Sequence, residues 1–289
     1  MNPTLRGLGW MMLSGLLFVV LNTTMRGIAL TMNPIEVQAL RYSAGIIVML
    51  PLIARTGLQA WRPASGWWGQ VRRGIVHTTS LLLWFTALPH IPIADTTAIS
   101  FTTPIFVMIG AVIFLGEKMI WERWVAALIG FSGVLVVVGG GISGHGGAYT
   151  LLMLSSSPLI AASYLISKSL TRHDKPSVIV AWQSITVAML SLPIAALDWT
   201  WPSMVQWILL LLCGLMGSTG HYCLTRAFVA ADISATQPAR FVDLAWSSAA
   251  GWIAFQEVPT KGTLIGAAII LGGTTWLAQR ERAIRMRQA

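Results

Sequence analysis

Charged residues are scarce in this chain. Only 10% of its 289 residues are Asp, Glu, Lys or Arg, whereas 55% are hydrophobic, and an ordinary soluble domain carries about 25% charged residues. So few charges cannot cover a surface of normal size, which excludes an ordinary soluble protein. Cysteine is also rare. Cys213 and Cys223 lie ten residues apart on one predicted helix, a rise of about 15 Å that excludes a disulfide between them.

Motifs for cofactor-dependent chemistry are absent as well. The sequence has no Gly-x-x-x-x-Gly-Lys-Ser/Thr phosphate loop and no Cys/His cluster with metal-ligand spacing, so it supports neither ATP-driven pumping nor a metal site. No Ser/His/Asp set can be placed together from the sequence. We expect no cofactor, no metal and no enzyme activity.

Long apolar runs are what the chain has in abundance. A helix needs about 20 apolar residues to cross a hydrocarbon core of about 30 Å, and runs such as 134–138 and 208–213 do not alternate as membrane strands do. We therefore predict an all-α integral membrane protein, embedded in a lipid bilayer, with ten transmembrane helices. Their approximate ranges are 7–29, 35–54, 72–89, 93–115, 121–140, 148–170, 176–197, 203–228, 232–256 and 261–279.

The net charge of +9 would suggest a nucleic-acid partner in a soluble protein. Here most basic residues fall on one side of the predicted membrane, and the positive-inside rule makes that side cytoplasmic. We therefore predict no nucleic acid, a multi-pass protein of the inner or plasma membrane, and cytoplasmic N- and C-termini. The predicted cytoplasmic residues are Arg6, Arg55, Arg62, Arg72, Arg73, Lys118, Arg123, Lys168, Arg172, Lys175, Arg226, Arg280, Arg282, Arg285 and Arg287.

The second half of the chain repeats part of the first with an offset of 140 residues. Each half contributes five spans, an odd number, so the second copy must enter the membrane in the opposite orientation. We predict two inverted five-helix repeats, residues 1–143 and 144–289, with a shared site near the bilayer midplane. The matching pairs are Gly74/Gly214, Thr79/Thr219, Ala87/Ala227, Ile93/Ile233, Thr96/Thr236, Phe101/Phe241 and Glu117/Glu257.

Several motifs resemble the drug/metabolite transporter superfamily, and within it the EamA-type ten-helix transporters. The first copy carries Ala87 to Ile99, Thr103-Pro104 and Leu115-Gly116-Glu117-Lys118, and the second carries Arg226-Ala227-Phe228, Gln237-Pro238 and Gln256-Glu257. The resemblance covers nearly the whole chain and implies a secondary transporter. One departure is Gln256, where the family commonly has Gly before the glutamate.

Ionisable residues inside a span are expensive, so each is a candidate for the transport site. Arg240 and Asp243 are three residues apart near the middle of the predicted span 232–256, hence on one helical face. Arg240 could hold a carboxylate or phosphate while Asp243 accepts a proton or an ammonium group. The alternative is an internal ion pair that only orders the helix. For Arg41, in the second span, we expect a packing role satisfied by carbonyls or by Asp95.

Histidine and aromatic residues complete the candidate site. His77 and Trp84 are seven residues apart on nearly the same helical face, and histidine can also relay protons near neutral pH. We expect substrate contacts from His77, Trp84, Tyr164, Tyr222, Arg240 and Asp243, with Asp243 and His77 as candidates for proton coupling. His221, beside Tyr222, is a weaker candidate. Pro104, Pro158 and Pro238 are expected to interrupt or kink their spans.

These features predict a secondary transporter that moves a small organic metabolite by alternating access. An amino-acid-like, vitamin-like or nucleoside-like solute fits the polar and aromatic candidates; protons are a further candidate partner, and a monomer and a homodimer both stay open. One alternative is a multidrug exporter, although the first span, 8–29, lacks the acidic residue on which small multidrug exporters rely. A membrane-embedded enzyme and a passive channel are the others; the repeat and the apolar span ends argue against them.

Overall fold

A computed structural model describes residues 3–29, 31–90, 99–138, 147–256 and 261–286. All regular structure in these ranges is helical, which confirms the predicted all-α membrane fold of two inverted five-helix repeats. The α-helices are α1 (Pro3–Ala29), α2 (Pro34–Thr56), α3 (Trp67–Ala87), α5 (Thr103–Leu115), α6 (Trp121–Val138), α7 (Ala148–Leu170), α8 (Pro176–Ala195), α9 (Met204–Ala230), α10 (Ile233–Thr236), α11 (Asp243–Phe255) and α12 (Lys261–Met286). Short 3₁₀ segments are η1 (Leu58–Trp61), η2 (Leu88–His90), η3 (Ala196–Asp198) and η4 (Gln237–Val242).

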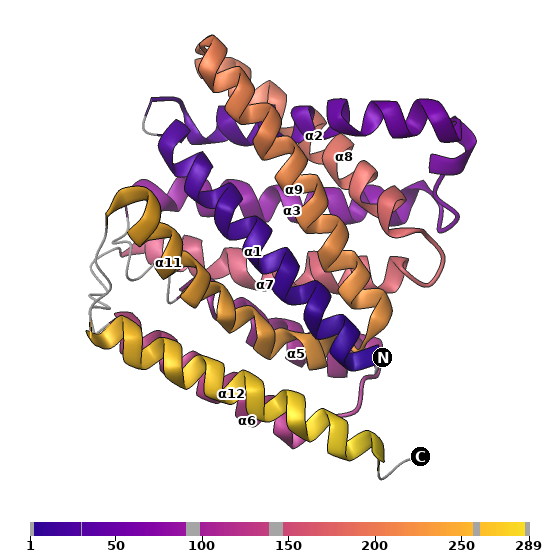
Figure 1. Ribbon diagram of the computed structural model, residues 1–289. Coiled ribbons are helices and arrows are strands. Elements are labelled where there is room, and N and C mark those ends of the chain that lie inside the picture. Colours follow the sequence, from indigo (N-terminus) through magenta and orange to yellow (C-terminus); the bar gives the residue numbers. More distant parts are fainter. Residues whose placement is uncertain (1–2, 30, 91–98, 139–146, 257–260, 287–289) are drawn as a thin grey trace.

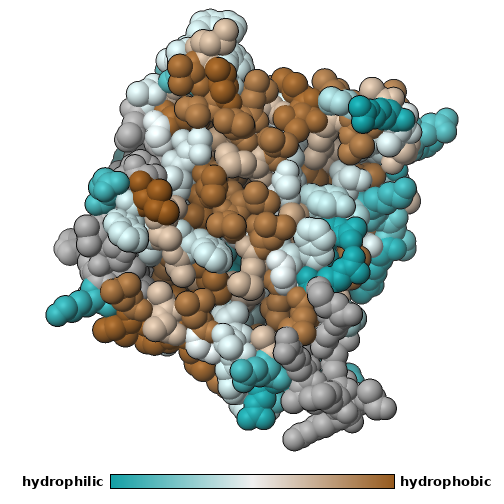
Figure 2. Space-filling model, in the orientation of Figure 1, coloured by the Kyte–Doolittle hydropathy of each residue, from teal (hydrophilic) through white to brown (hydrophobic). Residues whose placement is uncertain are grey.

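Five helices of the described chain are long and apolar enough to cross a membrane, by length and composition. They are Pro3–Met25, Pro34–Thr56, Ala148–Leu170, Pro176–Asp198 and Met204–Ala230. Their outward faces carry large apolar side chains such as Leu13 on α1, Met189 on α8 and Ile208 on α9. Figure 2 shows a broad apolar face on this side of the molecule, with hydrophilic residues mostly near its edges. Lipid rather than water is the natural solvent for this face.

The span predicted as one helix over 232–256 is instead broken into α10, η4 and α11. Pro238 lies in the first turn of η4, because proline lacks the N–H that a continuing helix needs. Pro104 likewise lies in the first turn of α5, after a turn at residues 101–102 that separates α5 from helical residues 99–100, so the predicted span 93–115 is interrupted here, as expected. Pro158 does lie inside α7, as expected.

The packed helix pairs reflect the repeat, because replacing each helix by its counterpart in the other half turns one packed pair into another. Counting along each half, α1 corresponds to α7, α2 to α8, α3 to α9, α5 to α11 and α6 to α12. The packed pairs α1·α9 and α3·α7 are therefore copies of one another, as are α1·α11 and α5·α7, whereas α2·α8 and α6·α12 each pair two equivalent helices. Figure 1 shows α6 beside α12, and both ends of the chain at the same end of the bundle. The predicted boundary at 143/144 lies outside the described residues.

The second helices of the two halves, α2 and α8, each contain two prolines, and these prolines occur at equivalent positions. Pro34 and Pro176 both lie in the first turn of their helices, and Pro51 and Pro193 both lie inside them. Each pair is 142 residues apart, so this offset relates α2 to α8. We call residues related by 142 in these two helices, or by 140 from α3 onward, repeat partners.

Candidate functional site

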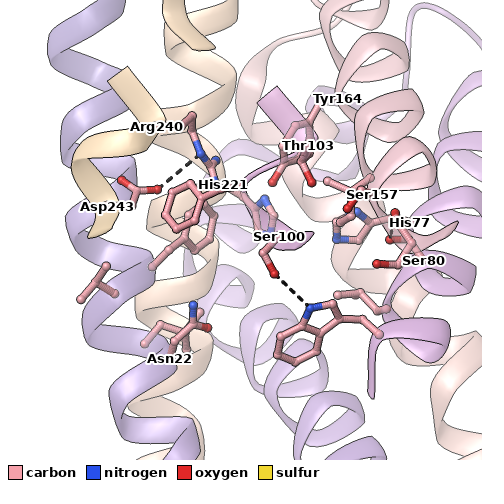
Figure 3. Close-up of a pocket in the computed structure, with 18 of the residues that line it drawn as sticks. Asn22, His77, Ser80, Ser100, Thr103, Ser157, Tyr164, His221, Arg240 and Asp243 are labelled. Atoms are coloured by element: carbon pink, nitrogen blue, oxygen red, sulfur yellow. Dashed lines mark hydrogen bonds and ion pairs between the residues drawn. The ribbon is translucent and has the colours of Figure 1, made fainter. Parts of the chain in front are cut away.

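A cavity of about 410 Å³ lies between the two halves (Figure 3). Its walls come from α1, α2, α3, α5, α7, α9, η4 and α11, so both repeats contribute. Five of the six residues that the sequence nominated for substrate contact line it: His77, Trp84, Tyr164, Arg240 and Asp243. Their role in binding stays a prediction, but the structure brings them to one place.

The depth of the cavity follows from the exposure of its lining. Tyr42, His77 and His221 are buried, whereas Asn22 and Ser247 are exposed. Asn22 lies in the half of α1 that is remote from the N-terminus. The exposed rim of the described lining is therefore at the end of the bundle away from both termini.

Arg240 and Asp243 form an ion pair on the cavity wall (Figure 3). Arg240 Nε lies 3.4 Å from Asp243 Oδ2, and the two side chains are 20% and 14% exposed. The i,i+3 spacing brings them together as predicted, although Arg240 belongs to η4 and Asp243 begins α11. An acidic residue in the first turn of a helix is favourable. The Arg240 guanidinium also lies 5.8 Å from the ring centroid of Tyr164.

Gly15 on α1 makes room for this pair. A Cβ at Gly15 would lie 1.8 Å from Asp243 Oδ1, which no side chain could tolerate. The helix backbone of the first half thus approaches the charged side chain of the second half directly. Asp243 Oδ1 and Arg240 Nη1 are buried and have no hydrogen-bond partner among the described residues, so within this part of the chain the pair does not use all of its hydrogen-bonding capacity.

A network of polar side chains lies at the deep end of the cavity. Tyr42 Oη is 3.0 Å from His77 Nε2, and Ser163 Oγ is 3.2 Å from His77 Nδ1. Gln183 Nε2 donates to Tyr42 Oη at 3.4 Å and lies 3.3 Å from His221 Nε2. The two imidazole rings approach edge to face, with centroids 5.7 Å apart. His77 and His221 therefore link helices of the two halves at the base of the cavity.

Two arginines flank this network. Arg73, expected among the cytoplasmic charges, is instead fully buried in α3, where it donates to Ile179 O at 3.0 Å and to Gln183 Oε1 at 2.5 Å. Its burial follows from the start of α3 at Trp67, five residues before the expected span, which draws Arg73 into the bundle; its cytoplasmic side stays a prediction. Arg41 lines the cavity, with its guanidinium 4.0 Å from the ring centroid of Tyr42.

Aromatic side chains form the wall on the first half. Trp84 Nε1 donates to Ser100 Oγ at 3.4 Å (Figure 3), and its ring meets Phe85 edge to face at 5.0 Å. Tyr222, by contrast, is not part of the lining; its ring lies 6.0 Å from the guanidinium of Arg226. Successive residues of a helix point about 100° apart, so the helix that turns His221 into the cavity turns Tyr222 away from it.

Polar contacts between the halves close the opposite end of the bundle. Glu117 of the first half accepts hydrogen bonds from the backbone N–H groups of Ile233 and Ser234 at 2.7 and 3.0 Å. Arg123 pairs with Asp232 at 3.1 Å and also bonds to Ser234 Oγ at 2.8 Å. A carboxylate at the start of α10 is well placed for backbone donors. These contacts hold the two repeats together on the side where the termini lie.

A second carboxylate joins the halves at this end. Asp174 Oδ1 accepts from the N–H groups of Ala64 and Ser65 at 2.6 and 3.1 Å, and Gln70 Nε2 donates to Asp174 Oδ2 at 2.8 Å. Ser65 Oγ donates to the same carboxylate. Asp174 lies between α7 and α8, so it ties the second half to the loop before α3.

Sequence reasoning missed several lining residues. Ser100 and Thr103 line the cavity and are the repeat partners of Arg240 and Asp243. The 140-residue offset could have identified them. Tyr42 gave no such signal, because a tyrosine inside a span is more often a packing residue, and Arg41 was assigned to packing alone.

Comparisons with known proteins agree on one family. The model of the EamA-like transporter family matches residues 5–139 and 148–279. The S-adenosylmethionine uptake transporter of Rickettsia bellii is 30% identical, covering 98% of each chain. The riboflavin transporter of Rhizobium johnstonii is 31% identical over 94% of this chain and 90% of the relative.

More distant proteins match over similar lengths. The pseudopaline exporter CntI of Pseudomonas aeruginosa is 24% identical over 90% of this chain and 91% of the relative. A solved crystal structure of another protein has the same fold, with a TM-score of 0.78 at 21% identity, over 94% of this chain and 95% of the other.

Proposed function

The chain belongs to the EamA-like transporter family, and on that premise we propose that the cavity between its halves binds a small, planar heterocyclic metabolite, which the protein carries across the cytoplasmic membrane by alternating access. The observation that carries this proposal is the cavity itself. Aromatic side chains and a charged pair from both repeats line one space of about 410 Å³, a size suited to a metabolite or a drug-sized molecule.

The family and the relatives make this chain a small-metabolite transporter and not an enzyme. Two relatives carry heterocyclic compounds by name, S-adenosylmethionine and riboflavin. The walls offered by Trp84, Phe85 and Tyr164 suit flat rings of this kind, because aromatic faces stack on them. Lipophilic cations fit less well. Arg41 and Arg240 oppose them, and Asp243 is the one carboxylate among the described lining residues.

We place the termini on the cytoplasmic side, because most Lys and Arg residues of the sequence lie toward that side. With that orientation the exposed rim faces outward, and the contacts of Glu117, Arg123 and Asp174 seal the cytoplasmic end. Transport to the other state then requires these contacts to break while the rim closes. Accessibility labelling of single cysteines at two exposed positions, Asn22 and Arg172, tests the orientation: outside reagent should modify Asn22→Cys and spare Arg172→Cys.

Proton coupling is the second part of the proposal. Asp243 and His77 both line the cavity, and each can gain or lose a proton as the site is exposed to either side. We expect Asp243→Asn or His77→Gln to abolish the stimulation of uptake by an imposed pH gradient in proteoliposomes. Uptake that keeps its full pH dependence in both variants would end the case for coupling through these residues.

Binding of named compounds tests the substrate class. A ligand that binds only the folded state raises the melting temperature of the purified protein in detergent. The panel contains S-adenosylmethionine, S-adenosylhomocysteine, riboflavin, adenosine, tryptophan and two lipophilic drug cations. We expect stabilisation by at least one heterocyclic metabolite, and a loss of about tenfold or more in its affinity in Trp84→Ala, since stacking on an aromatic contributes about 1–3 kcal/mol. Stabilisation by the drug cations alone would contradict the proposal.

A further inference from the structure

Arg41 is a buried charge with no ion-pair partner among the described residues, and Asp95, the partner considered from the sequence, lies outside them. Arg41 is 7% exposed and lines the cavity. It makes no hydrogen bond or ion pair to another described residue, and its Nε is among the buried atoms that have no partner. The ring of Tyr42, 4.0 Å from the guanidinium carbon, is its one charge-related contact in the described part of the chain.

A guanidinium in this position needs compensation. Removing a charge from water inside a membrane protein is costly unless an opposite charge or several hydrogen bonds replace the lost solvent. A cation–π contact with one tyrosine offsets only part of that cost. In contrast, Arg240 has Asp243 as a partner, and Arg73 donates to a carbonyl and to Gln183. Of the two arginines that line the cavity in the described part of the chain, Arg41 is the one whose charge no described carboxylate compensates.

The repeat shows that the fold does not require this charge. The repeat partner of Arg41 on α8 is Gln183, a neutral residue at the equivalent place in an equivalent helix. The space that the guanidinium occupies also exists in one copy only. A Cβ at Gly217 would lie 2.8 Å from Arg41 NH1, whereas the repeat partner of Gly217 is His77. The α2·α9 contact thus leaves room for a cation where the equivalent α8·α3 contact is filled by an imidazole.

The surrounding charges favour an anion. The described lining contains Arg41 and Arg240 against the single carboxylate of Asp243, which Arg240 already neutralises, and the fully buried Arg73 lies just behind Gln183. The deep end of the cavity is therefore electropositive. In a low-dielectric site such fixed positive charge attracts an anionic group strongly.

We infer that Arg41 binds an acidic group of the transported metabolite, a carboxylate or a phosphate. The guanidinium offers a planar pair of donors suited to either group. The inference rests on the proposed function, since it names a chemical feature of the solute that the cavity holds: a heterocycle with an acidic substituent, whose ring lies toward Trp84 and whose acid lies toward Arg41.

Matched pairs of probes test this inference. S-adenosylhomocysteine and 5′-methylthioadenosine share the adenosine and the thioether, but only the first bears an amino-carboxylate. Riboflavin 5′-phosphate and riboflavin differ by a phosphate. In wild-type protein we expect the acidic member of at least one pair to bind about tenfold more tightly or better, as suits a hydrogen bond to a charged group. The pair that discriminates tells carboxylate from phosphate.

Variants of Arg41 assign the preference to this residue. Arg41→Gln installs the repeat partner's side chain, so the helix should still pack, and it should bring both members of the pair to similar affinity. Arg41→Lys keeps the charge without the planar fork and should retain part of the preference. Arg72→Gln, an exposed arginine on α3 outside the cavity, is the matched control and should behave as wild type.

The outcomes separate this inference from the proposed function. If the neutral members bind wild-type protein as tightly as the acidic ones, or if Arg41→Gln weakens both members equally, Arg41 has a packing role and the inference is wrong, while the proposed function stands. If none of the heterocycles in the whole panel binds, both fail. If Arg41→Gln does not fold, Arg41→Lys decides. A preference for the acidic probe that is as large in Arg41→Lys as in wild type would overturn the inference, because it would show that the planar guanidinium does not bind the acid.

Discussion

The two halves of this transporter share a backbone plan and differ in chemistry. Where the copies meet, repeat partners Phe101 and Phe241 stack on each other with ring centroids 5.8 Å apart and planes inclined by 18°. Gly74 and Gly214 likewise occupy equivalent close contacts, against α8 and α2 respectively. Positions that shape the helices are thus the same in both copies.

The charged positions of the cavity are not duplicated. Arg240 and Asp243 correspond to Ser100 and Thr103, and Arg41 corresponds to Gln183. Each charge therefore has a neutral counterpart at an equivalent place in the fold. The comparison separates two properties: the two copies share the scaffold on which alternating access depends, and they differ at the charged positions to which we assign recognition of the solute.

The largest effect should come from breaking the charged pair in the second half. Asp243→Asn leaves Arg240 buried without a partner and should cost about 3 kcal/mol of stability. Replacing both residues by those of the first copy, Arg240→Ser with Asp243→Thr, should cost less than Asp243→Asn alone. Thermal unfolding in detergent of wild type, Arg240→Ser, Asp243→Thr and the double variant measures the coupling. If the two single effects simply add, Arg240 and Asp243 do not stabilise each other. The difference in charge between the two halves would then have no effect on stability through this pair.

A smaller effect should distinguish the two equivalent glycines. A Cβ at Gly214 would lie 2.7 Å from backbone atoms of Ala44 and Gly45, whereas a Cβ at Gly74 would collide with the side chain of Thr186, the repeat partner of Ala44. Both alanine variants should lose about 1–3 kcal/mol, as overpacked sites do. A second substitution can remove the overlap only in Gly74→Ala, because the overlap in Gly214→Ala involves backbone atoms that no substitution removes.

The measurement is the rescue by Thr186→Gly, because an alanine would keep the Thr186 Cβ, which lies 2.4 Å from a Cβ at Gly74. We expect Gly74→Ala to lower the melting temperature much less in the Thr186→Gly background than in wild type, and Gly214→Ala to lower it equally in both backgrounds. Equal rescue of both glycine variants would mean that α2 and α8 shift freely, and that the scaffold is less rigid than the equivalence of the two contacts implies.

Much of this architecture could be predicted from sequence, because the hydrophobic runs and the 140-residue offset are properties of the chain itself. The three-residue spacing placed Arg240 and Asp243 on one face, and the structure brings them together as an ion pair. Pro238 indicated a break in its span, but the start of α11 at Asp243 and the burial of Arg73 could not be predicted in the same way. Both depend on where a helix begins, which packing decides within a turn or two.

The arrangement of the polar network was beyond sequence reasoning for a different reason. Tyr42, Gln183 and His221 come from three helices, and nothing in the chain relates their positions before those helices pack. Tyr222 shows the same limit from the other direction, because a shift of one residue on α9 separates a side chain in the cavity from one outside it. Spacing along a helix predicts a shared face but not which face turns inward.

The smallest effect concerns the turns that end α5 and α11, which have the same backbone conformation but different residues. Gly116 and Gln256 are repeat partners, and both end their helices in the left-handed region, with φ of 67° and 57°. Glycine adopts this conformation freely, whereas a residue with a Cβ pays about 1–2 kcal/mol. Gln256→Gly should therefore stabilise the protein by about 1 kcal/mol, and Gly116→Gln should destabilise it by a similar amount.

Thermal unfolding of both single variants and of the exchanged double variant measures these opposite signs. In the exchanged protein the two effects should nearly cancel, since each copy then carries the other's residue in the same backbone conformation. Destabilisation by Gln256→Gly would show that the glutamine side chain, whose amide lies 3.5 Å from Ile253 O, contributes more than the strain it imposes. The second copy would then have its own way of ending the helix, and the equivalence of the two scaffolds would stop short of this turn.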